Sequence, residues 1–457
     1  MIKNKNIFIP ESGLYQNFLI TGTIGTGKTS SAMYPFTEQL IYYNSKSLNF
    51  KKIGILILDV KGNYYKFISN LCKKYGLIND LIVIELDSNI TYNPLDKPNL
   101  KPQVLANQLK TIMSLFSENN SDSFWLDKAE QVLTECIKLC RLYNDGYVNF
   151  LELHKLIFFQ DYFNEKIKLL KEKFINNLFS KKEIYDLNSC LNFFQKEFNN
   201  LDQRTLAILK SEISRITNTF VSDYDIQQTF SPPKGEETFN GFSEILDNGK
   251  IVVLNMNISE YKNLSKIIAT YLKLDFQTEI LKNLSANSIK RSAFICDEYD
   301  KYASKTDGEF FSLSREAKCI NIISTQSYSS IKDSLNSDIA STVIIQNLIN
   351  KIWFRTDDIF TIEESQKQIG KEQKKLISKS ISEGARETKF SYFTNSLNSE
   401  FSNISETFNT YSQNDFIYDT NFFSQNLKTF EALTFLSNGL KILKPTKLKM
   451  LPYFDKK

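Results

Sequence analysis

The sequence is poor in the residue types that most metal centres and acid–base catalysts use. Only one histidine, His154, is present among 457 residues, and its helix-type surroundings place it on the surface of a helix. Six cysteines are scattered without a Cys-x-x-Cys pair. Cys136 and Cys140 could share a helix face, but without a second pair we expect small buried hydrophobic residues in a reducing, cytosolic environment. Histidine-based catalysis and histidine-rich metal sites are therefore disfavoured.

Long apolar runs are also missing. No stretch approaches the roughly 18–20 apolar residues that span a bilayer, and the start, Met1-Ile-Lys-Asn-Lys-Asn, is not followed by the apolar segment of a signal peptide. The net charge of +4 is small for this length and permits a local basic surface without predicting one. We expect a cytoplasmic protein of two to three domains with no transmembrane segment of its own.

One octapeptide, residues 22–29, carries the strongest functional signal. It fits G-x-x-x-x-G-K-[ST], the phosphate-cradling loop of P-loop NTPases. An apolar strand-like run precedes it, and a helix is expected to begin near Lys28, because no helix breaker comes before Pro35. Lys28 is expected to reach the β- and γ-phosphates of ATP, and the Thr29 hydroxyl to ligate Mg²⁺. The predicted nucleotide-binding residues are Gly22, Thr23, Ile24, Gly25, Thr26, Gly27, Lys28, Thr29 and Ser30.

A P-loop needs an acidic partner on a neighbouring strand, and residues 292–298 supply it. This apolar run ends in Asp297 and Glu298. Asp297 is expected to hold the Mg²⁺ shell, and Glu298 to orient and polarise the attacking water. The strand predicted at 321–326 ends in Gln326, which is expected to sense the γ-phosphate. Together with the P-loop, these residues predict a hydrolysis site.

Two arginines are candidates for contacts between subunits. Arg315 lies just before the strand that ends in Gln326. It is either an arginine finger, usually worth about 10³–10⁵ in rate, or a member of an ordinary surface salt bridge. Arg355, at the end of the run 351–355, is a weaker candidate.

The spacing of the apolar runs predicts an α/β fold with a mostly parallel sheet. Expected strands are 17–24, 54–60, 81–86, 251–257, 293–297, 321–326 and 351–355. The long gap between the third and fourth carries helix-type patterns at 104–116, 125–143, 163–179 and 206–220. We therefore predict a nucleotide-binding core of residues 1–96 and 246–457, interrupted by an all-helical domain at 97–245.

The last hundred residues are more polar than the preceding sheet segments. After Arg355 the chain is expected to be helical and polar through 378–414, with basic residues on either a solvated helix face or a DNA-facing surface. In the tail, 432–454, apolar and polar residues alternate around Ser437-Asn-Gly439, a hairpin signal that predicts edge strands. The basic residues of this segment are Lys367, Lys371, Lys374, Lys375, Lys379, Arg386 and Lys389.

Several further motifs resemble TraG/TraD-like type IV secretion coupling proteins, members of the FtsK/HerA superfamily of P-loop motors. Leu58-Asp59-Val60-Lys61-Gly62 is similar to their Asp-Pro-Lys-Gly signature, with Val60 in place of proline. Tyr92-Asn93-Pro94-Leu95 resembles their Asn-Pro-Leu segment, and Phe124-Trp125 the opening of their helical domain. Arg315 and Gln326 fall where this family has its arginine finger and sensor glutamine. The resemblance covers residues 15–454.

The resemblance implies a RecA-like ATPase that uses ATP and Mg²⁺, forms a hexameric ring and pumps DNA, with a relaxase attached, toward a transfer channel. One departure is that the P-loop begins at residue 22, with no membrane helices before it. Either a separate membrane partner tethers the protein to the inner face of the membrane, or it is a soluble relative. Two alternatives remain: an FtsK/HerA-like motor for duplex DNA in DNA processing or defence, and an ATP-gated adaptor that recruits a relaxase.

Overall fold

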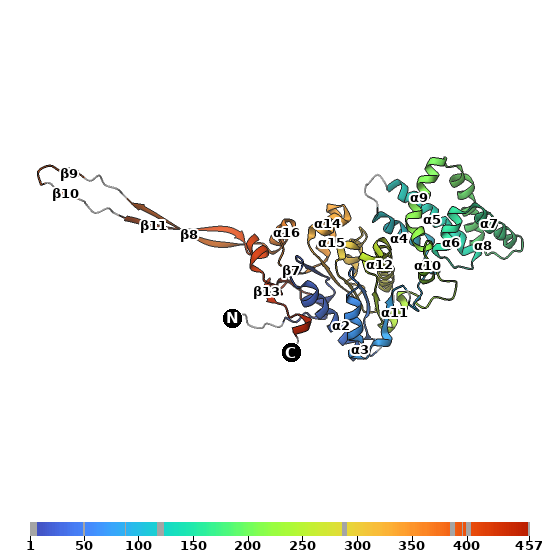
Figure 1. Cartoon of the computed structure of the whole chain (residues 1–457), viewed down its shortest axis with the longest axis horizontal. Helices are drawn as coiled ribbons and strands as arrows, with labels where there is room; N and C mark the ends of the chain where they lie inside the picture. The colour runs from blue at the N-terminus through green and yellow to red at the C-terminus, as the bar shows by residue number, and fades with distance from the viewer. Residues whose placement is uncertain are drawn as a thin grey trace.

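The structure is a computed structural model of the full chain, and it describes residues 7–48, 51–86, 88–116, 123–285, 290–383, 389–394, 396–398 and 404–455. Figure 1 shows three regions along the long axis of the molecule. A sheet with helices packed around it lies in the middle, a lobe of helices at one end and a two-stranded ribbon at the other.

The central sheet has nine strands in the order β13-β12-β7-β1-β6-β5-β2-β4-β3. Strands β1 to β7 are parallel, whereas β12 and β13 extend one edge in the antiparallel sense. All seven strands predicted from the apolar runs are present, as are the predicted edge strands of the tail, so the α/β prediction is confirmed. The strands are β1 (Phe18–Thr21), β2 (Gly54–Leu58), β3 (Leu81–Ile84), β4 (Ile251–Leu254), β5 (Ser292–Cys296), β6 (Cys319–Thr325), β7 (Asn350–Phe354), β12 (Glu431–Phe435) and β13 (Thr446–Lys449).

Helices cover both faces of this sheet, because alternate strand residues point to opposite sides. Leu19 of β1 joins the apolar cluster on one face, while Phe18 and Ile20 join the cluster on the other. The first face is covered by α11 (Phe242–Asn248), α12 (Ile258–Lys282), α13 (Asp307–Leu313), α14 (Tyr328–Leu335) and α15 (Asp338–Asn347). The second is covered by α1 (Glu11–Leu14), α2 (Tyr34–Lys46) and α3 (Tyr64–Tyr75). The helix expected near Lys28 begins as a π-helical turn, Thr29–Met33, and continues past Pro35 as α2.

The helical lobe lies between β3 and β4 in sequence, and its described residues, 88–116 and 123–250, contain no strand. All four helices predicted there are present, whereas α6, α8, α10 and α11 were not predicted. The apolar core of the lobe is continuous with one face of the sheet, so the division at residues 96 and 246 stays a prediction from the sequence. The helices are α4 (Pro102–Ser114), α5 (Ser123–Tyr143), α6 (Phe150–Phe158), α7 (Gln160–Ile175), α8 (Lys181–Asn192), α9 (Gln203–Val221) and α10 (Tyr224–Phe230).

The scarce histidine and the cysteines are packing residues. His154 lies on α6, where its Nδ1 is 3.1 Å from the Thr217 hydroxyl and its ring stacks on Phe158 at 4.5 Å, so it is partly buried. All six cysteines are buried and none forms a disulfide, as expected of small hydrophobic residues.

The polar segment after β7 differs from its prediction. Helix α16 (Ile359–Ile369) is followed by β8 (Lys371–Glu383) and β11 (Ile404–Phe416), which form an antiparallel ribbon. The helical structure predicted after Arg355 is therefore present in α16, but the prediction is wrong over the described residues of 378–414, since Ser, Thr and alternating isoleucines suit extended chain better than helix. Further out, β9 (Lys389–Ser391) pairs with β10 (Ser396–Asn398), and Arg386 lies outside the described residues.

Within the described part of the chain, helices with enough length and apolar character to cross a bilayer are lacking.

Candidate nucleotide site

The P-loop connects the carboxyl end of β1 to the π-helical turn that starts α2. Two of its glycines are required by their surroundings. At Gly22 (φ 153°), a Cβ atom would lie 2.6 Å from the Cβ of Phe354, and at Gly27 (φ 102°), 2.5 Å from the Cδ1 of Phe430. Both backbone angles also disfavour L-residues. The loop is therefore closely packed between β7 and the chain that leads into β12.

Lys28 lies across the loop that carries it. Its Nζ donates hydrogen bonds to the carbonyl oxygens of Gly22 and of Thr23, the latter at 3.2 Å. Burial lowers the pKa of this amine, and the nearby carboxylates of Asp297 and Glu298 oppose that shift. A phosphate that entered the loop would offer this cation a charged acceptor in place of the carbonyls.

Thr29 and Asp297, 268 residues apart in sequence, are brought together: the Thr29 hydroxyl donates to Asp297 Oδ2 at 2.8 Å. Asp297 follows β5 and the P-loop follows β1, and both strands end at the same edge because the sheet is parallel. Ser324 donates to the other carboxylate oxygen. Neighbouring ligands of an octahedral Mg²⁺ with bonds of about 2.0–2.1 Å lie roughly 2.9 Å apart, so this oxygen pair fits that ion.

Glu298 is held in an unusual conformation beside this pair. Its backbone is left-handed (φ 49°, ψ 50°), which is uncommon outside glycine. Its carboxylate forms an ion pair with Lys61, with Nζ and Oε1 2.6 Å apart. That ion pair raises the pKa of Lys61. Glu298 is therefore tethered by a residue that follows β2, the neighbour of β5 in the sheet.

The Asp59–Gly62 motif explains how Lys61 is positioned. The carboxylate of Asp59 accepts backbone N–H groups of Lys61 (3.1 Å), Asn63 (2.9 Å) and Tyr64 (3.1 Å), which folds the chain between β2 and α3 into a tight loop. Burial raises the pKa of Asp59 while these hydrogen bonds counteract it. The role of Lys61 could not be predicted from the sequence, because the adjacency of β2 and β5 is a property of the strand order.

A buried ion pair supports the segment after Glu298. Lys273 of α12 and Asp307 of α13 are fully buried, with Nζ and Oδ2 2.6 Å apart. The Tyr299 hydroxyl donates to the same oxygen at 2.5 Å. Since Tyr299 follows Glu298 directly, this network connects the acidic end of β5 to the long helix α12.

Gln326 and Arg355 flank the P-loop. The Gln326 carbonyl accepts the N–H of Gly22 at 3.2 Å, and the Arg355 carbonyl accepts the N–H of Thr23 at 2.9 Å. Gln326 is half-buried, and Arg355 is exposed. Both residues therefore lie beside the predicted phosphate site, at the ends of β6 and β7.

Arg315 is not brought to this site. It is an exposed residue in the turn between α13 and β6, so it lies at the amino edge of the sheet, whereas the P-loop lies at the carboxyl edge. The seven residues of β6 separate the two edges by about 20 Å. An action of Arg315 on a P-loop therefore requires a second subunit.

A segment near the carboxyl end of the chain also borders the loop, a contact that the sequence does not predict. Phe430 donates its N–H to the Thr26 carbonyl at 3.0 Å and accepts one from Met450 at 2.7 Å. Tyr453 makes edge contacts with Tyr34 and Phe67, which stack on each other at 4.1 Å. These contacts connect residues of three distant parts of the chain.

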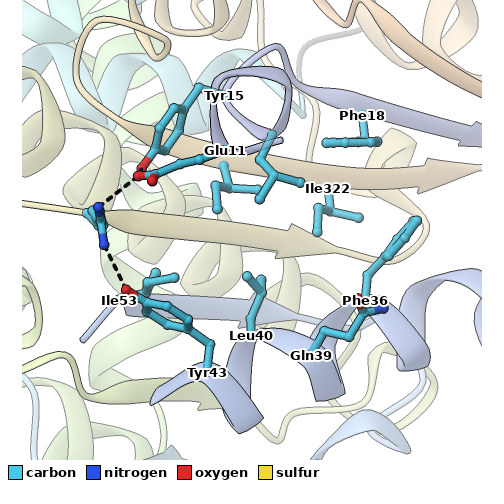
Figure 2. A pocket seen from close by; sticks show the side chains of 12 residues that line it. Glu11, Tyr15, Phe18, Phe36, Gln39, Leu40, Tyr43, Ile53 and Ile322 are labelled. Carbon is cyan, nitrogen blue, oxygen red and sulfur yellow. Dashed lines mark hydrogen bonds and ion pairs between the residues drawn. The ribbon is translucent and has the colours of Figure 1, made fainter. Parts of the chain in front are cut away.

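A separate apolar cavity of about 270 Å³ lies between α1 and α2 (Figure 2). Phe36 and Leu40 of α2 and Ile322 of β6 line it. Arg291 crosses one side, 2.9 Å from the Glu11 carboxylate and 2.7 Å from the Tyr43 hydroxyl. Because Arg291 precedes β5, the cavity lies toward the amino edge of the sheet, away from the P-loop.

Comparison with known protein families agrees with this geometry. The family model described as the type IV secretion-system coupling protein DNA-binding domain matches residues 4–404. The chain belongs to this family. The predicted resemblance to coupling proteins is thereby confirmed.

Solved structures with the same fold include coupling proteins. Unbound TrwBdeltaN70, a bacterial conjugative coupling protein, has a TM-score of 0.63 at 12% identity, over 100% of this chain and 90% of that chain. TrwB in complex with ADP and Mg²⁺ has a TM-score of 0.61 at 13% identity, over 99% and 90%. VirB4 of Thermoanaerobacter pseudethanolicus has a TM-score of 0.50 at 13% identity, over 96% and 90%. No curated protein sequence matches the chain.

Proposed function

We propose that this coupling protein is an ATP-driven motor that moves DNA, with a bound relaxase, toward a type IV secretion channel. The observation that carries the proposal is the 2.8 Å contact between Thr29 and Asp297, with Lys28 and Glu298 beside it. A P-loop threonine, an acidic strand end and an adjacent glutamate are the parts that ATP hydrolysis requires. Membership of the coupling-protein family supports DNA as the substrate.

In this proposal each site residue has a distinct task. Lys28 neutralises the phosphates of ATP, and Thr29 with Asp297 holds Mg²⁺, which offsets the charge that develops during phosphoryl transfer. Glu298 orients the attacking water, and Lys61 holds Glu298 in place. Gln326 monitors the terminal phosphate. The similar protein TrwB forms complexes with a non-hydrolysable ATP analogue and with ADP and Mg²⁺, which supports this choice of nucleotide and ion.

The proposal also includes a ring. Because Arg315 lies at the sheet edge opposite its own P-loop, a finger role requires that a neighbouring subunit present it. A hexamer that pumps DNA from the cytoplasmic side, where ATP is supplied, meets this requirement. The helical lobe is the proposed region for selecting the relaxase.

The first test is ATP hydrolysis with and without single-stranded or duplex DNA. Lys28→Ala should reduce the DNA-stimulated rate by about 100-fold or more, because it removes the cation at the phosphates. Lys46→Ala, an exposed lysine on the neighbouring helix α2, serves as the control and should leave the rate unchanged. An unaltered rate in Lys28→Ala would refute the proposal, and hydrolysis without movement along DNA would favour the adaptor alternative.

The second test asks whether sites are shared between subunits. Lys28→Ala and Arg315→Ala proteins should each be inactive alone. Mixed one to one, about one interface in four should combine an intact Lys28 with an intact Arg315 from the neighbour. Recovery of hydrolysis on mixing supports the shared site. If Arg315→Ala is fully active by itself, Arg315 takes no part in hydrolysis and is an ordinary surface residue.

A further inference from the structure

The ribbon of β8 and β11 presents two chemically different faces. In an antiparallel pair, directly opposite residues share a face and successive residues alternate. Lys379 is opposite Phe408, and Ile381 is opposite Glu406, all on the same face. We call this the basic–apolar face; its described side chains are Lys371, Gln373, Lys375, Ile377, Lys379, Ile381, Glu406, Phe408, Thr410, Ser412, Asn414 and Phe416.

The basic–apolar face is strongly exposed. Ile377, Ile381 and Phe408 have 69%, 55% and 61% of their surface accessible to water. Lys371 lies 4.7 Å from the centre of the Phe416 ring, and Lys379 lies 5.6 Å from that of Phe408. Glu406, the one acidic residue among the described side chains of this face, is 2.9 Å from Lys379. The face thus combines exposed apolar groups with net positive charge.

The opposite face is mostly uncharged. Its charged residues lie near the base of the ribbon, where Lys374 is 3.4 Å from Asp415 and Glu372 is opposite that aspartate. Tyr411 is an aromatic residue of the same face. The remaining described side chains of this face are small and polar: Ser378, Ser380, Ser382, Ser405, Thr407, Asn409 and Gln413. Water can solvate these groups at little cost, so the two faces of the ribbon suit different surroundings.

A ribbon of this kind needs a partner. Two strands alone are marginally stable in water, and both strands here are edges with unpaired backbone groups along their outer sides. Figure 1 shows the ribbon projecting from the body at the end opposite the helical lobe. The exposed side chains of Ile377, Ile381 and Phe408 are therefore not covered by the body of the same chain.

The chemistry of the basic–apolar face selects among partners. DNA would satisfy the lysines, but Ile377 and Ile381 would meet phosphates. A lysine ammonium already lies over each of the rings of Phe408 and Phe416, so a base that stacked there would have to displace it. A second copy of the same face would cover the apolar groups but bring two sets of three lysines together. An anionic lipid surface accepts both kinds of group, with apolar side chains at the acyl boundary and lysines at the phosphates.

We propose that the basic–apolar face of the β8–β11 ribbon docks on an anionic lipid bilayer and holds the motor at a membrane surface. The polar face then remains in water. At the turn between β9 and β10, Tyr392 and Phe393 are 91% and 103% exposed, and they add apolar groups beyond the ribbon. This inference is independent of ATP hydrolysis, since none of these residues lies at the nucleotide site.

The test is sedimentation of the full chain with vesicles of phosphatidylcholine alone or with added phosphatidylglycerol. The wild type should bind only the anionic vesicles, and less tightly at high salt. Lys375→Gln with Lys379→Gln should weaken binding by about 30-fold, from the contribution of each lysine near an anionic surface. Ile377→Ser with Ile381→Ser should weaken it by at least tenfold.

A matched control changes the other face: Ser380→Gln with Thr407→Gln should bind as the wild type does. All variants should keep the far-ultraviolet circular dichroism spectrum and unfolding temperature of the wild type, because the ribbon lies outside the core. The proposal is overturned if the wild type does not bind anionic vesicles, or if the lysine and isoleucine variants of the basic–apolar face both bind them as the wild type does. It is equally overturned if those variants instead lose only DNA affinity, measured by anisotropy, or change only the oligomeric state, measured by light scattering.

Discussion

The contact between Gly27 and Phe430 provides a quantitative test of how the carboxyl-terminal segment packs on the P-loop. In Gly27→Ala, the added Cβ would lie 2.5 Å from Cδ1 and 2.9 Å from Cε1 of the Phe430 ring. Contacts below 3.0 Å require that something moves. The backbone of Phe430 is fixed by hydrogen bonds to Thr26 and Met450, so relief requires either a rotation of the Phe430 ring or a shift of the P-loop.

The expected cost has two separable parts. A backbone with φ of 102° costs an L-residue about 1–2 kcal/mol. Overpacking against the ring costs about 1–3 kcal/mol. Gly27→Ala should therefore lower the free energy of unfolding, or of nucleotide binding, by about 2–5 kcal/mol in total. Phe430→Ala removes the ring, so the double variant should recover the overpacking part but not the backbone part.

A double-mutant cycle measures the coupling directly. Urea unfolding and the binding of a fluorescent ATP analogue are measured for the wild type, both single variants and the double variant. We expect a coupling free energy of about 1–3 kcal/mol in favour of the double variant. If the two substitutions are simply additive, Phe430 does not pack on Gly27, and the assignment of the terminal segment to the P-loop is wrong.

Two further predictions concern lysines. Lys61→Met should lower kcat for ATP hydrolysis by about 3- to 10-fold, because Lys61 no longer holds Glu298 in place. Stability should be nearly unchanged, because the ion pair with Glu298 is partly exposed and contributes under about 1 kcal/mol to folding. An unchanged kcat would show that Lys61 has no part in the site. Burial lowers the pKa of Lys351 to about 7, so above that pH the unfolded chain binds more protons than the folded one. Stability to urea should therefore rise by up to about 1.4 kcal/mol from pH 7 to pH 8, and Lys351→Met should abolish that rise. Nearer pH 9 the buried cysteines, whose pKa values burial raises, oppose it because their thiols ionise first in the unfolded chain.

Much of the nucleotide site is local in sequence and could be predicted. The P-loop needs its glycines, lysine and threonine within eight residues, and Asp297 with Glu298 directly ends an apolar strand. Lys61 illustrates the limit: its motif was visible, but its partner Glu298 is 237 residues away and becomes adjacent only because β2 pairs with β5. The same holds for Phe430, whose approach to Thr26 depends on where β12 joins the sheet.

The ribbon could not be predicted from the sequence for a different reason. Its isoleucines and lysines alternate every two residues, yet its many Ser and Asn residues gave no clear periodic signal, and neither strand has a core to pack against. The pairing of β8 with β11 brings together residues about 20 to 45 positions apart, which composition alone does not reveal.

By itself, the sequence determined the seven parallel strands, the helical character of the segment between β3 and β4, and the chemistry of the loop at residues 22–29, because apolar periodicity and phosphate binding are properties of short segments. Only the tertiary structure decided which strand ends meet, which lysine holds Glu298, that Arg315 lies on the far edge from its own P-loop, and that two polar segments form a ribbon with one basic–apolar face. These features depend on contacts between residues distant in sequence, and the free energy of such contacts comes from the packed fold as a whole.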